Sequence, residues 1–543
     1  SSPAGIAAAT AAGRLGMHVG VFEPLKMIGG MGAAGNLALH DGPTAEHTGF
    51  AREFALRAGA EYGLNDTEVP QPESFVSAAV YYKMLSSAGV GASSVQLGCP
   101  VAAATTATGP DGVSRVATVT FDCQPSAVTV AAKVFIDASY DADVVVAAGD
   151  VPYTAGREAN TTYGESLGGA RVPSVYKGPR NLSAVKADGS ILHFVANISE
   201  LAAPGAADDA LMAFQHRMCI SGDADRVPWP KPDGYNPDDF ELMQRAIDAT
   251  GNADAFTPMP PGSAIQQHGY PGTKKKYTLC CGITVVASDQ PMLNRGWANA
   301  SWAERQRIDA AHTYFELGTF YYIANDPRVP ADVRAQFQKY GLCRDEYADN
   351  MHMPVQLYVR ISNRLVSDFV LTQNNIGHPR VKPDGIAVGE WGFDEHMTGK
   401  YAVPNGAGGF TVMLEGNFNP SIAEACPEAD PPGSGNSPSW YDLPYRAIVP
   451  KRGTGGNLLV PVCLSASAVA YASTRIENMF MSVGGAAGVA AKLYVDSAPM
   501  ATVQDVNVSE VQRILTTVFQ QRVHGPPGHG FPPTPAPPPT IPP

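Results

Sequence analysis

The stretch SSPAGIAAATAAGRLGMHVGVFEPLKMIGGM, residues 1–31, decides the fold of this chain. Its Ala-rich part, from Pro3 to about Leu15, predicts a helix, and Pro3 suits the first turn. Residues 19–22, VGVF, then predict a short buried strand that stops at Glu23. A helix followed by a strand is the second half of a nucleotide-binding βαβ unit. We expect the first strand of that unit to lie before Ser1, outside this sequence.

Gly5 and Glu23 fit two roles in a dinucleotide-binding fingerprint. The last glycine of G-x-G-x-x-G lets the helix pack close to the strand, and an acidic residue about 20 positions later binds a ribose hydroxyl. With Gly5 as that last glycine, Ser2 occupies the second glycine position and the first position falls before Ser1. Such a stretch is as typical of an ordinary α/β core as of a cofactor site, so later motifs must decide.

Composition excludes several classes of protein. A chain of 543 residues can bury a large core and is long enough for two or more structural units. Its 38 Lys and Arg against 51 Asp and Glu give a net charge of −13, which argues against nucleic acid or an anionic membrane as the main partner. We find no apolar run that predicts a transmembrane helix. No H-E-x-x-H or P-loop motif occurs, and we expect neither a metal centre nor covalent serine catalysis.

The eight cysteines form no C-x-x-C pair, which argues against zinc-ribbon and thioredoxin-like sites. We expect free, buried cysteines. The adjacent Cys280 and Cys281 leave open a redox-active pair beside a cofactor, against simple packing. A secretory route is favoured by six N-x-[ST] sequons, which begin at Asn65, Asn160, Asn181, Asn197, Asn299 and Asn507.

The first 150 residues continue with α/β patterns. Helices are predicted at residues 48–62 and 74–86. Three β-rich runs follow, and we expect them to form a three-stranded antiparallel insert: 95–101, 113–121 and 128–136. The last run leads directly into the loop DASYDAD, residues 137–143. Open α/β sheets bind their ligands at such strand-end loops.

Residues 151–450 have a different character, with many loops and few clear helices. The capping-box sequence that starts at Ser301 predicts a helix as far as residue 326, and a second helix is predicted from about 330 to 341. A third predicted helix, at 356–372, would place Arg360 and Arg364 on one face. We interpret this part as a separate α+β domain that faces the substrate.

From residue 451 the chain returns to α/β character. Residues 457–462 predict a buried strand, and residues 484–491, GGAAGVAA, predict a glycine-rich entry into a helix. The N-terminus of such a helix attracts an anion or an electron-rich ring edge. We expect 1–150 and 451–497 to form one discontinuous nucleotide-binding domain. Beyond it we expect a C-terminal extension at 498–520 and an extended, disordered Pro-rich tail at 521–543.

The chain resembles the FAD-dependent oxidoreductases of the glutathione-reductase-like superfamily, in a poorly characterised branch. The order and spacing of several motifs carry this resemblance together: residues 2–9 with Glu23 and Pro24, 25–35, 135–139, 156–158, 226–232, 325–330, 356–360, 444–446, 449–453 and 464–467. The resemblance implies a Rossmann-like three-layer FAD-binding domain that lacks its first strand here, with an inserted substrate domain.

The resemblance also implies which residues bind FAD. Ser2, Pro3, Ala4 and Gly5 would border the pyrophosphate, and Glu23 would bind the adenosine ribose. The rest would follow the pyrophosphate and flavin (Gly29, Gly30, Met31), lie in the strand-end loop (Asp137, Ser139), or place a helix N-terminus by the flavin pyrimidine ring (Gly484, Gly485, Ala487, Gly488). Positive potential at that N-terminus would stabilise the anionic reduced flavin.

Three residues are candidates for substrate chemistry. His396, in WGFDEH, matches a family position and could accept a proton from an alcohol or amine donor, although a structural histidine is the alternative. Arg360 and Arg446 could clamp a substrate carboxylate or oxyanion, against structural ion pairs. Ile361 follows Arg360 where relatives carry an acidic residue, so no adjacent carboxylate partner is expected. Three aromatic residues could line a substrate wall or simply belong to the core: Tyr358, Trp391 and Tyr445.

The sequence thus favours an FAD-dependent oxidase or dehydrogenase that acts on a small polar molecule. A tRNA-modifying flavoprotein is an alternative from the same superfamily, and the acidic charge argues against it. A degenerate binding or structural protein without FAD is the other alternative, because the fingerprint is incomplete. Neither the substrate, the electron acceptor nor the oligomeric state follows from the sequence.

Overall fold

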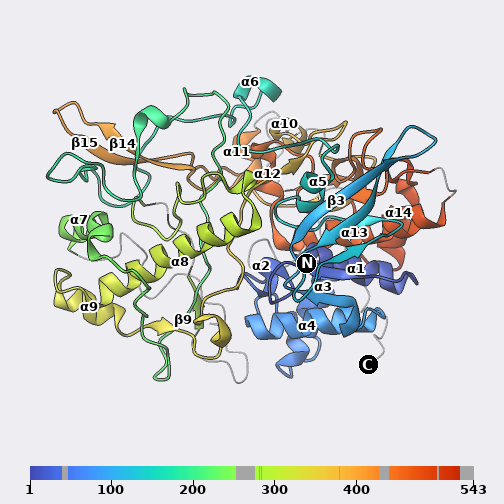
Figure 1. Cartoon of the computed structure of the whole chain (residues 1–543), viewed down its shortest axis with the longest axis horizontal. Coiled ribbons are helices and arrows are strands. Elements are labelled where there is room, and N and C mark those ends of the chain that lie inside the picture. The colour runs from blue at the N-terminus through green and yellow to red at the C-terminus, as the bar shows by residue number, and fades with distance from the viewer. Residues whose placement is uncertain are drawn as a thin grey trace.

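The computed structural model describes residues 1–39, 47–251, 276–279, 282, 284–377, 380–426, 440–497 and 501–525. It shows a mixed α/β protein with two lobes (Figure 1). One lobe holds the first and the last of the described residues, and the other holds much of the middle of the chain. Across these described ranges, no helix is long and apolar enough to span a membrane.

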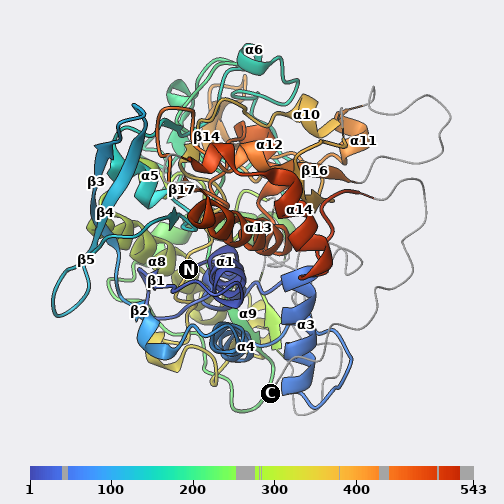
Figure 2. The same cartoon turned by 90° about the vertical axis from the view of Figure 1, so that its right-hand side faces the viewer.

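The predicted first helix is confirmed as α1 (Pro3–Arg14). Ser2 caps it, and its Oγ accepts a hydrogen bond from the Gly5 amide at 3.4 Å. Most of α1 is buried because its small side chains pack against α13 (Glu477–Asp496), which lies beside it in Figure 2. Helices from the two ends of the sequence therefore form one packed pair.

Two pairs of parallel strands lie next to these helices. β1 (Val21–Glu23) pairs with β2 (Val95–Leu97), and β6 (Phe135–Ile136) pairs with β17 (Leu458–Leu459). In Figure 2 the strands lie between the α1–α13 pair and a three-stranded antiparallel sheet. That sheet contains β3 (Val101–Thr108), β4 (Ser114–Phe121) and β5 (Val128–Val130).

A three-stranded antiparallel sheet was thus predicted correctly, but some of the residues assigned to it were wrong. Residues 95–97 and 135–136 pair with parallel strands instead. The sequence of a short apolar strand does not indicate which other strand it pairs with.

The predicted helices at 48–62 and 74–86 are confirmed as α3 (Gly49–Glu61) and α4 (Ser74–Ser87). The same lobe contains the short helices α2 (Gly30–Ala33), α5 (Asp143–Ala148), α6 (Asn160–Tyr163), α10 (Gln373–Gly377), α11 (Ile422–Ala425) and α12 (Ala468–Thr474), and the antiparallel pairs β7 (Tyr153–Thr154) with β12 (Arg364–Leu365) and β13 (Gly385–Gly389) with β16 (Tyr441–Pro444).

The other lobe is built around the long helix α8 (Trp302–Asn325). As predicted, the Ser301 Oγ caps it and accepts a hydrogen bond from the Glu304 amide at 3.3 Å. The second predicted helix is α9 (Ala331–Phe337). Around them lie α7 (Glu241–Thr250), an antiparallel sheet of β9 (Cys219–Ser221), β10 (Lys276–Thr278) and β11 (Gly341–Leu342), and a sheet of β8 (Ala196–Asn197), β14 (Gly399–Pro404) and β15 (Phe410–Glu415).

The third predicted helix, at 356–372, is wrong. Residues 356–363 form neither a helix nor a strand, and β12 follows them. Residues 357–361 are all buried, so this segment has no polar face to place in solvent. The four-residue spacing of Arg360 and Arg364 suggested a helix face, but each arginine meets its own buried partners instead.

The expectation of free cysteines is wrong for four of them. Cys99 pairs with Cys123, and Cys219 pairs with Cys343. These disulfides join residues 24 and 124 positions apart, so spacing in the sequence gives no sign of them. Cys426 and Cys463 are free thiols, whereas Cys280 and Cys281 lie outside the described residues.

The larger hydrophobic core contains residues from both sides of residue 450. The larger core takes in residues such as Leu371, Phe393 and Leu443 from the predicted insert. The C-terminal end also packs on this lobe, through α14 (Val508–Thr517) and the buried Gln521, whose Nε2 donates to the carbonyls of Ile386 and Ser482. Residues 521–525 are therefore part of the fold, although the Pro-rich tail was predicted to start at 521.

A buried cation lies in the smaller core. Lys400, on β14, is 2% exposed, and its ammonium group is 5.9 Å from the centre of the Phe315 ring. No carboxylate in the described part of the chain pairs with it. Burial lowers the pKa of Lys400 to about 7.

We expect Lys400→Met to stabilise the protein, by about 2–5 kcal/mol at neutral pH, because methionine fills the same space without a charge to desolvate. An unfolded lysine binds its proton below about pH 10.4, whereas folded Lys400 binds it only below about pH 7. The native protein should therefore lose stability as pH falls through this window. Melting temperatures at pH 6.5 and 9.5 measure this: the advantage of the variant should be larger at the lower pH, and an equal shift at both would contradict the argument.

Candidate functional site

A cavity of about 850 Å³ lies between β1 and β6, in the lobe that contains α1 and α13. Six of the predicted cofactor residues line it: Ser2, Gly5, Glu23, Gly30, Asp137 and Ser139. These six residues, which the sequence motifs predicted to bind one cofactor, thus line one cavity in the structure.

Much of the cavity wall is apolar. Ala8 and Ala9 of α1 lie on one side, Phe121 and Val130 of the antiparallel sheet on the other, and residues of β1 and β6 between them. These surroundings, helix on one face and sheet on the other, are those of a buried parallel strand. A further strand of the βαβ unit, expected before Ser1, stays a prediction.

The N-terminus of α1 forms the polar end of the cavity. Ser2 ties it to the strand-end loop, because its Oγ donates a 2.7 Å hydrogen bond to the Ala138 carbonyl. A Cβ on Gly5 would lie 3.2 Å from the Ala138 Cβ, so glycine permits this close approach. The first turn contains no acidic residue. The positive end of the helix dipole is therefore available to an anion such as a phosphate.

Gly29 and Gly30 make a tight turn, with φ of 89° and 47°. A Cβ on Gly30 would lie 2.6 Å from the Tyr140 hydroxyl, so only glycine fits there. The Met31 amide donates to this hydroxyl at 2.9 Å, and the hydroxyl donates to the buried Glu477 carboxylate at 3.0 Å. Burial raises the pKa of Tyr140 well above its usual range and so keeps this donor protonated. Sequence analysis missed Tyr140 and Glu477, although Tyr140 lies within the DASYDAD loop.

Glu23 lies at the end of β1, as predicted. Its Oε1 accepts a hydrogen bond from the Leu25 amide at 3.0 Å, and its Oε2 accepts one from the Ser1 hydroxyl at 2.8 Å. A ribose hydroxyl would have to share these oxygens with Ser1.

Asp137 holds the strand-end loop in shape. One oxygen accepts hydrogen bonds from the Ser139 amide and hydroxyl, and the other accepts them from the amides of Val144 and Val145 in α5. Burial raises the pKa of Asp137, against these bonds that favour its charged form. Its contacts shape the wall of the cavity.

The predicted placement of Gly484, Gly485, Ala487 and Gly488 is wrong. They lie in the middle of α13, which begins at Glu477, and none lines the cavity. A Cβ on Gly484 would lie 2.1 Å from the Ala4 carbonyl oxygen, and one on Gly488 would lie 2.3 Å from that of Ala8. These glycines let α1 and α13 approach closely, so they support the cavity through helix packing. Pro3, Ala4, Gly29 and Met31 likewise lie behind its lining.

A polar seam between the lobes forms another wall of the cavity. Arg305 of α8 pairs with Asp143 at 2.7 Å and with Asp141 at 3.4 Å. The Trp297 indole N–H donates to Asp141 at 2.6 Å, and the Arg305 guanidinium lies 5.6 Å from the centre of the Trp297 ring. Burial raises the pKa of Asp143 to about 6. The sequence indicated the acidic loop but not its partners, which lie more than 150 residues away.

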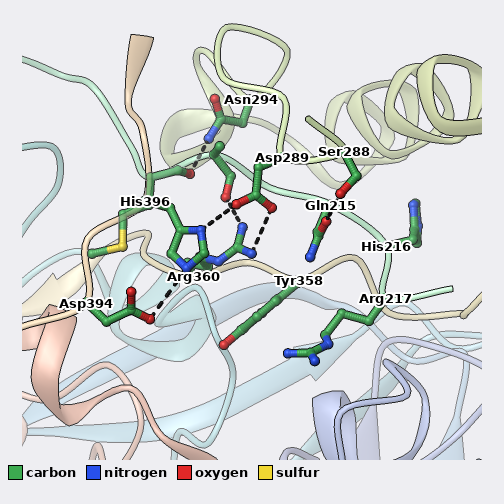
Figure 3. Close-up of polar contacts among 12 residues, drawn as sticks. Gln215, His216, Arg217, Ser288, Asp289, Asn294, Tyr358, Arg360, Asp394 and His396 are labelled. Atoms are coloured by element: carbon green, nitrogen blue, oxygen red, sulfur yellow. Dashed lines mark hydrogen bonds and ion pairs between the residues drawn. The ribbon is translucent and has the colours of Figure 1, made fainter. Parts of the chain in front are cut away.

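His396 and Arg360 lie together in a buried cluster, seen in Figure 3, and Asp289 joins them. Asp289 accepts a 2.9 Å hydrogen bond from Arg360 at one oxygen and a short one from His396 Nδ1 at the other. Burial alone would raise the pKa of Asp289, but the charge of Arg360 and the hydrogen bonds from Arg360 and His396 hold it below its usual range.

The Arg360 guanidinium is fully buried, donates to the Ala213 carbonyl, and lies 4.4 Å from the centre of the Tyr358 ring. It is therefore not available to clamp a substrate. As expected from Ile361, no carboxylate stands next to Arg360 in the sequence. Its carboxylate partner is Asp289, from a distant segment.

The other side of His396 faces a second pair of opposite charges. Its Nε2 lies 3.4 Å from Asp394 Oδ2, and Asp394 pairs with Arg475 at 2.9 Å. Arg475 also donates to the Tyr358 hydroxyl at 2.8 Å. Burial would raise the pKa of Asp394, but His396 and Arg475 keep it well below its usual range. The imidazole thus lies between two carboxylates, each held by an arginine.

Arg446 does not belong to this cluster. It is about half-exposed, pairs with Asp384 at 2.9 Å, and stacks on Phe369. Of the predicted aromatic wall, Tyr445 is buried in the core and donates to the Val503 carbonyl, while Tyr358 supports the two arginines. Leu357, which precedes Tyr358, lines the cavity. The chain therefore passes directly from the cavity wall into the His396 cluster.

These features fit a dinucleotide such as FAD. A glycine cradle that a Cβ would fill, a helix N-terminus without acidic residues, and a carboxylate at the end of β1 converge on one cavity. Backbone amides and a helix dipole bind a pyrophosphate, and a carboxylate binds a ribose.

The comparisons with known proteins agree with this chemistry. A family model described as FAD dependent oxidoreductase matches residues 1–515. Among solved structures, the crystal structure of Thermovibrio ammonificans THI4 is 21% identical, with a TM-score of 0.20; the match covers 27% of this chain and 56% of that one. A TM-score this low carries no argument about either fold or function. No curated protein matches the sequence.

If Gly484 serves helix packing, Gly484→Ala should destabilise the fold by about 1–3 kcal/mol, because the new methyl group would meet the Ala4 carbonyl. This should exceed the helix-propensity gain of at most about 1 kcal/mol. Gly91→Ala is the matched control, since nothing lies within 4 Å of its added Cβ. Thermal unfolding of both variants compares them, and equal melting temperatures would refute the packing role.

Proposed function

This chain belongs to the FAD-dependent oxidoreductase family, and we propose that it oxidises a small polar organic molecule by hydride transfer to FAD. The family match over residues 1–515 carries the proposal. We further propose that residues 1–150 and 451–497 form a three-layer, Rossmann-like FAD-binding domain, and that residues 151–450 supply the substrate-binding part.

The cavity supports this assignment of the cofactor. The amides at the start of α1, together with Gly5 and Gly30, would hold the pyrophosphate, and Glu23 would bind the ribose. Trp297, Tyr140 and Leu357 would contribute to the walls around the rest of the cofactor. When bound, FAD supplies the hydride acceptor. The residues of the chain must then orient the substrate, exclude water and accept its proton.

His396 is the proposed proton acceptor. A proton on Nδ1, donated to Asp289, leaves Nε2 with a lone pair on the side of the more exposed Asp394. Asp289 would then fix the tautomer and stabilise the imidazolium that forms after proton uptake. Arg360 holds the far oxygen of Asp289, so its proposed part is to position the base rather than to bind substrate.

Reconstitution with FAD tests the cofactor. We expect the purified protein to show the two absorption bands of oxidised flavin, either as isolated or after incubation with FAD and removal of the excess. A screen of alcohols, amines and sugars under anaerobic conditions should then find a compound that bleaches these bands. A folded protein that retains no FAD would contradict the proposal and favour the degenerate binding protein.

With such a compound in hand, His396→Asn should slow flavin reduction by about 100- to 10,000-fold while the protein still retains FAD. Asp289→Asn should also slow it and should change the pH dependence of the rate, because the imidazole loses its charged partner. The control is His193→Asn: His193 is half-exposed and pairs with Asp239, away from this cluster. Stopped-flow absorbance measures the rates. An unchanged rate in His396→Asn would remove His396 from the mechanism.

A further inference from the structure

The six sequon asparagines share one structural property. Every one is exposed, although they are scattered over both lobes: Asn65, Asn160, Asn181, Asn197, Asn299 and Asn507. An N-linked glycan is large and hydrophilic, so it requires a surface position. All six positions meet this condition in the folded protein.

Local contacts separate these six positions into two groups. The Asn197 side chain accepts a hydrogen bond from the Ser199 amide at 2.9 Å, and that of Asn507 caps α14. The Asn160 amide nitrogen, the atom that would carry the sugar, packs against Gly205, where an added Cβ would lie 2.8 Å from it. These three side chains have structural roles or crowded surroundings.

The other three asparagines, Asn65, Asn181 and Asn299, have no such contacts. No side-chain hydrogen bond to the described part of the chain involves their amides. Each of their sequons also has an exposed hydroxyl residue, Thr67, Ser183 and Ser301 respectively. Asn65 lies in the turn after α3, and Asn299 lies just before α8. A glycan at these positions would extend into solvent without displacing a contact.

The disulfides supply an independent observation about the compartment. Cys99–Cys123 and Cys219–Cys343 use four of the six cysteines that the structure describes, one pair in each lobe. Structural disulfides form and persist in oxidising compartments such as the lumen of the secretory pathway. N-linked glycans are added in the same compartment, so the two features are expected together.

We propose that Asn65, Asn181 and Asn299 carry N-linked oligosaccharides, added in an oxidising secretory compartment where both disulfides form. The donor is an oligosaccharide linked to a lipid through a diphosphate. The asparagine amide nitrogen attacks the anomeric carbon, a C–N bond forms, and the C–O bond to the diphosphate breaks. The amide loses a proton and the lipid diphosphate leaves, so no oxidant or reductant is consumed.

The test is to secrete the full chain from eukaryotic cells and to treat it with peptide-N-glycosidase in heavy-oxygen water. Each glycosylated asparagine then becomes a labelled aspartate, which peptide mass spectrometry locates. We expect labels at positions 65, 181 and 299, and non-reducing peptide maps should show both disulfides. The triple variant Asn65→Gln/Asn181→Gln/Asn299→Gln should lose most of the enzyme-dependent change in electrophoretic mobility, whereas the control Asn160→Gln should keep it.

Two results would overturn the proposal. A secreted chain with both disulfides but no label at the three positions would show that these sequons are not used. A chain that is labelled but retains four free thiols at positions 99, 123, 219 and 343 would show that the glycans are added without formation of the two disulfides. Neither result depends on FAD binding, so the proposed oxidoreductase activity is tested separately.

Discussion

The close contact between α1 and α13 is the constraint on which the rest of the structure depends. Gly484 and Gly488 present bare backbone to the carbonyls of Ala4 and Ala8, so two helices from opposite ends of the chain pack at a distance that side chains would prevent. This contact places the start of α1 beside the strand-end loop, and it places Glu477 where it can hold Tyr140. The position of the cavity therefore depends on small residues that do not line it.

Local sequence predicted the parts of the fold that local interactions determine. The Ala-rich helix after Pro3, the capped helix after Ser301 and the helices at 48–62 and 74–86 all form, because caps and amphipathic spacing act within one or two turns. The segment at 356–363 was predicted as a helix but forms neither a helix nor a strand. A run that is buried on every side has no periodicity from which a helix could be predicted. The predicted helix start at 484 was wrong for a related reason. Glycine is typical of helix ends, but here it serves close packing within a helix.

In the candidate site, too, residues in local motifs could be predicted, whereas contacts between distant segments could not. Motifs identified Gly5, Glu23, Gly30 and Asp137, all of which lie close to each other along the chain or follow a strand. The distant members of the His396 cluster could not be predicted. Asp289, which pairs with His396, and Arg475, which pairs with Asp394, come from segments about 100 and 80 residues away, and neither belongs to a motif. Buried charges need partners, but sequence does not say which ones. The observed pairing gives Arg360 a supporting role in place of the substrate clamp first expected.

The seam around Arg305 has a consequence for the way in which a ligand can enter. Arg305 belongs to one lobe and its carboxylate partners Asp141 and Asp143 to the other, and all three are largely shielded from water. A hinge motion that parted the lobes here would separate buried opposite charges and leave the Trp297 N–H without its acceptor. Breaking a buried pair in this way costs several kcal/mol. We therefore expect a bound molecule to exchange without opening the lobes at this seam.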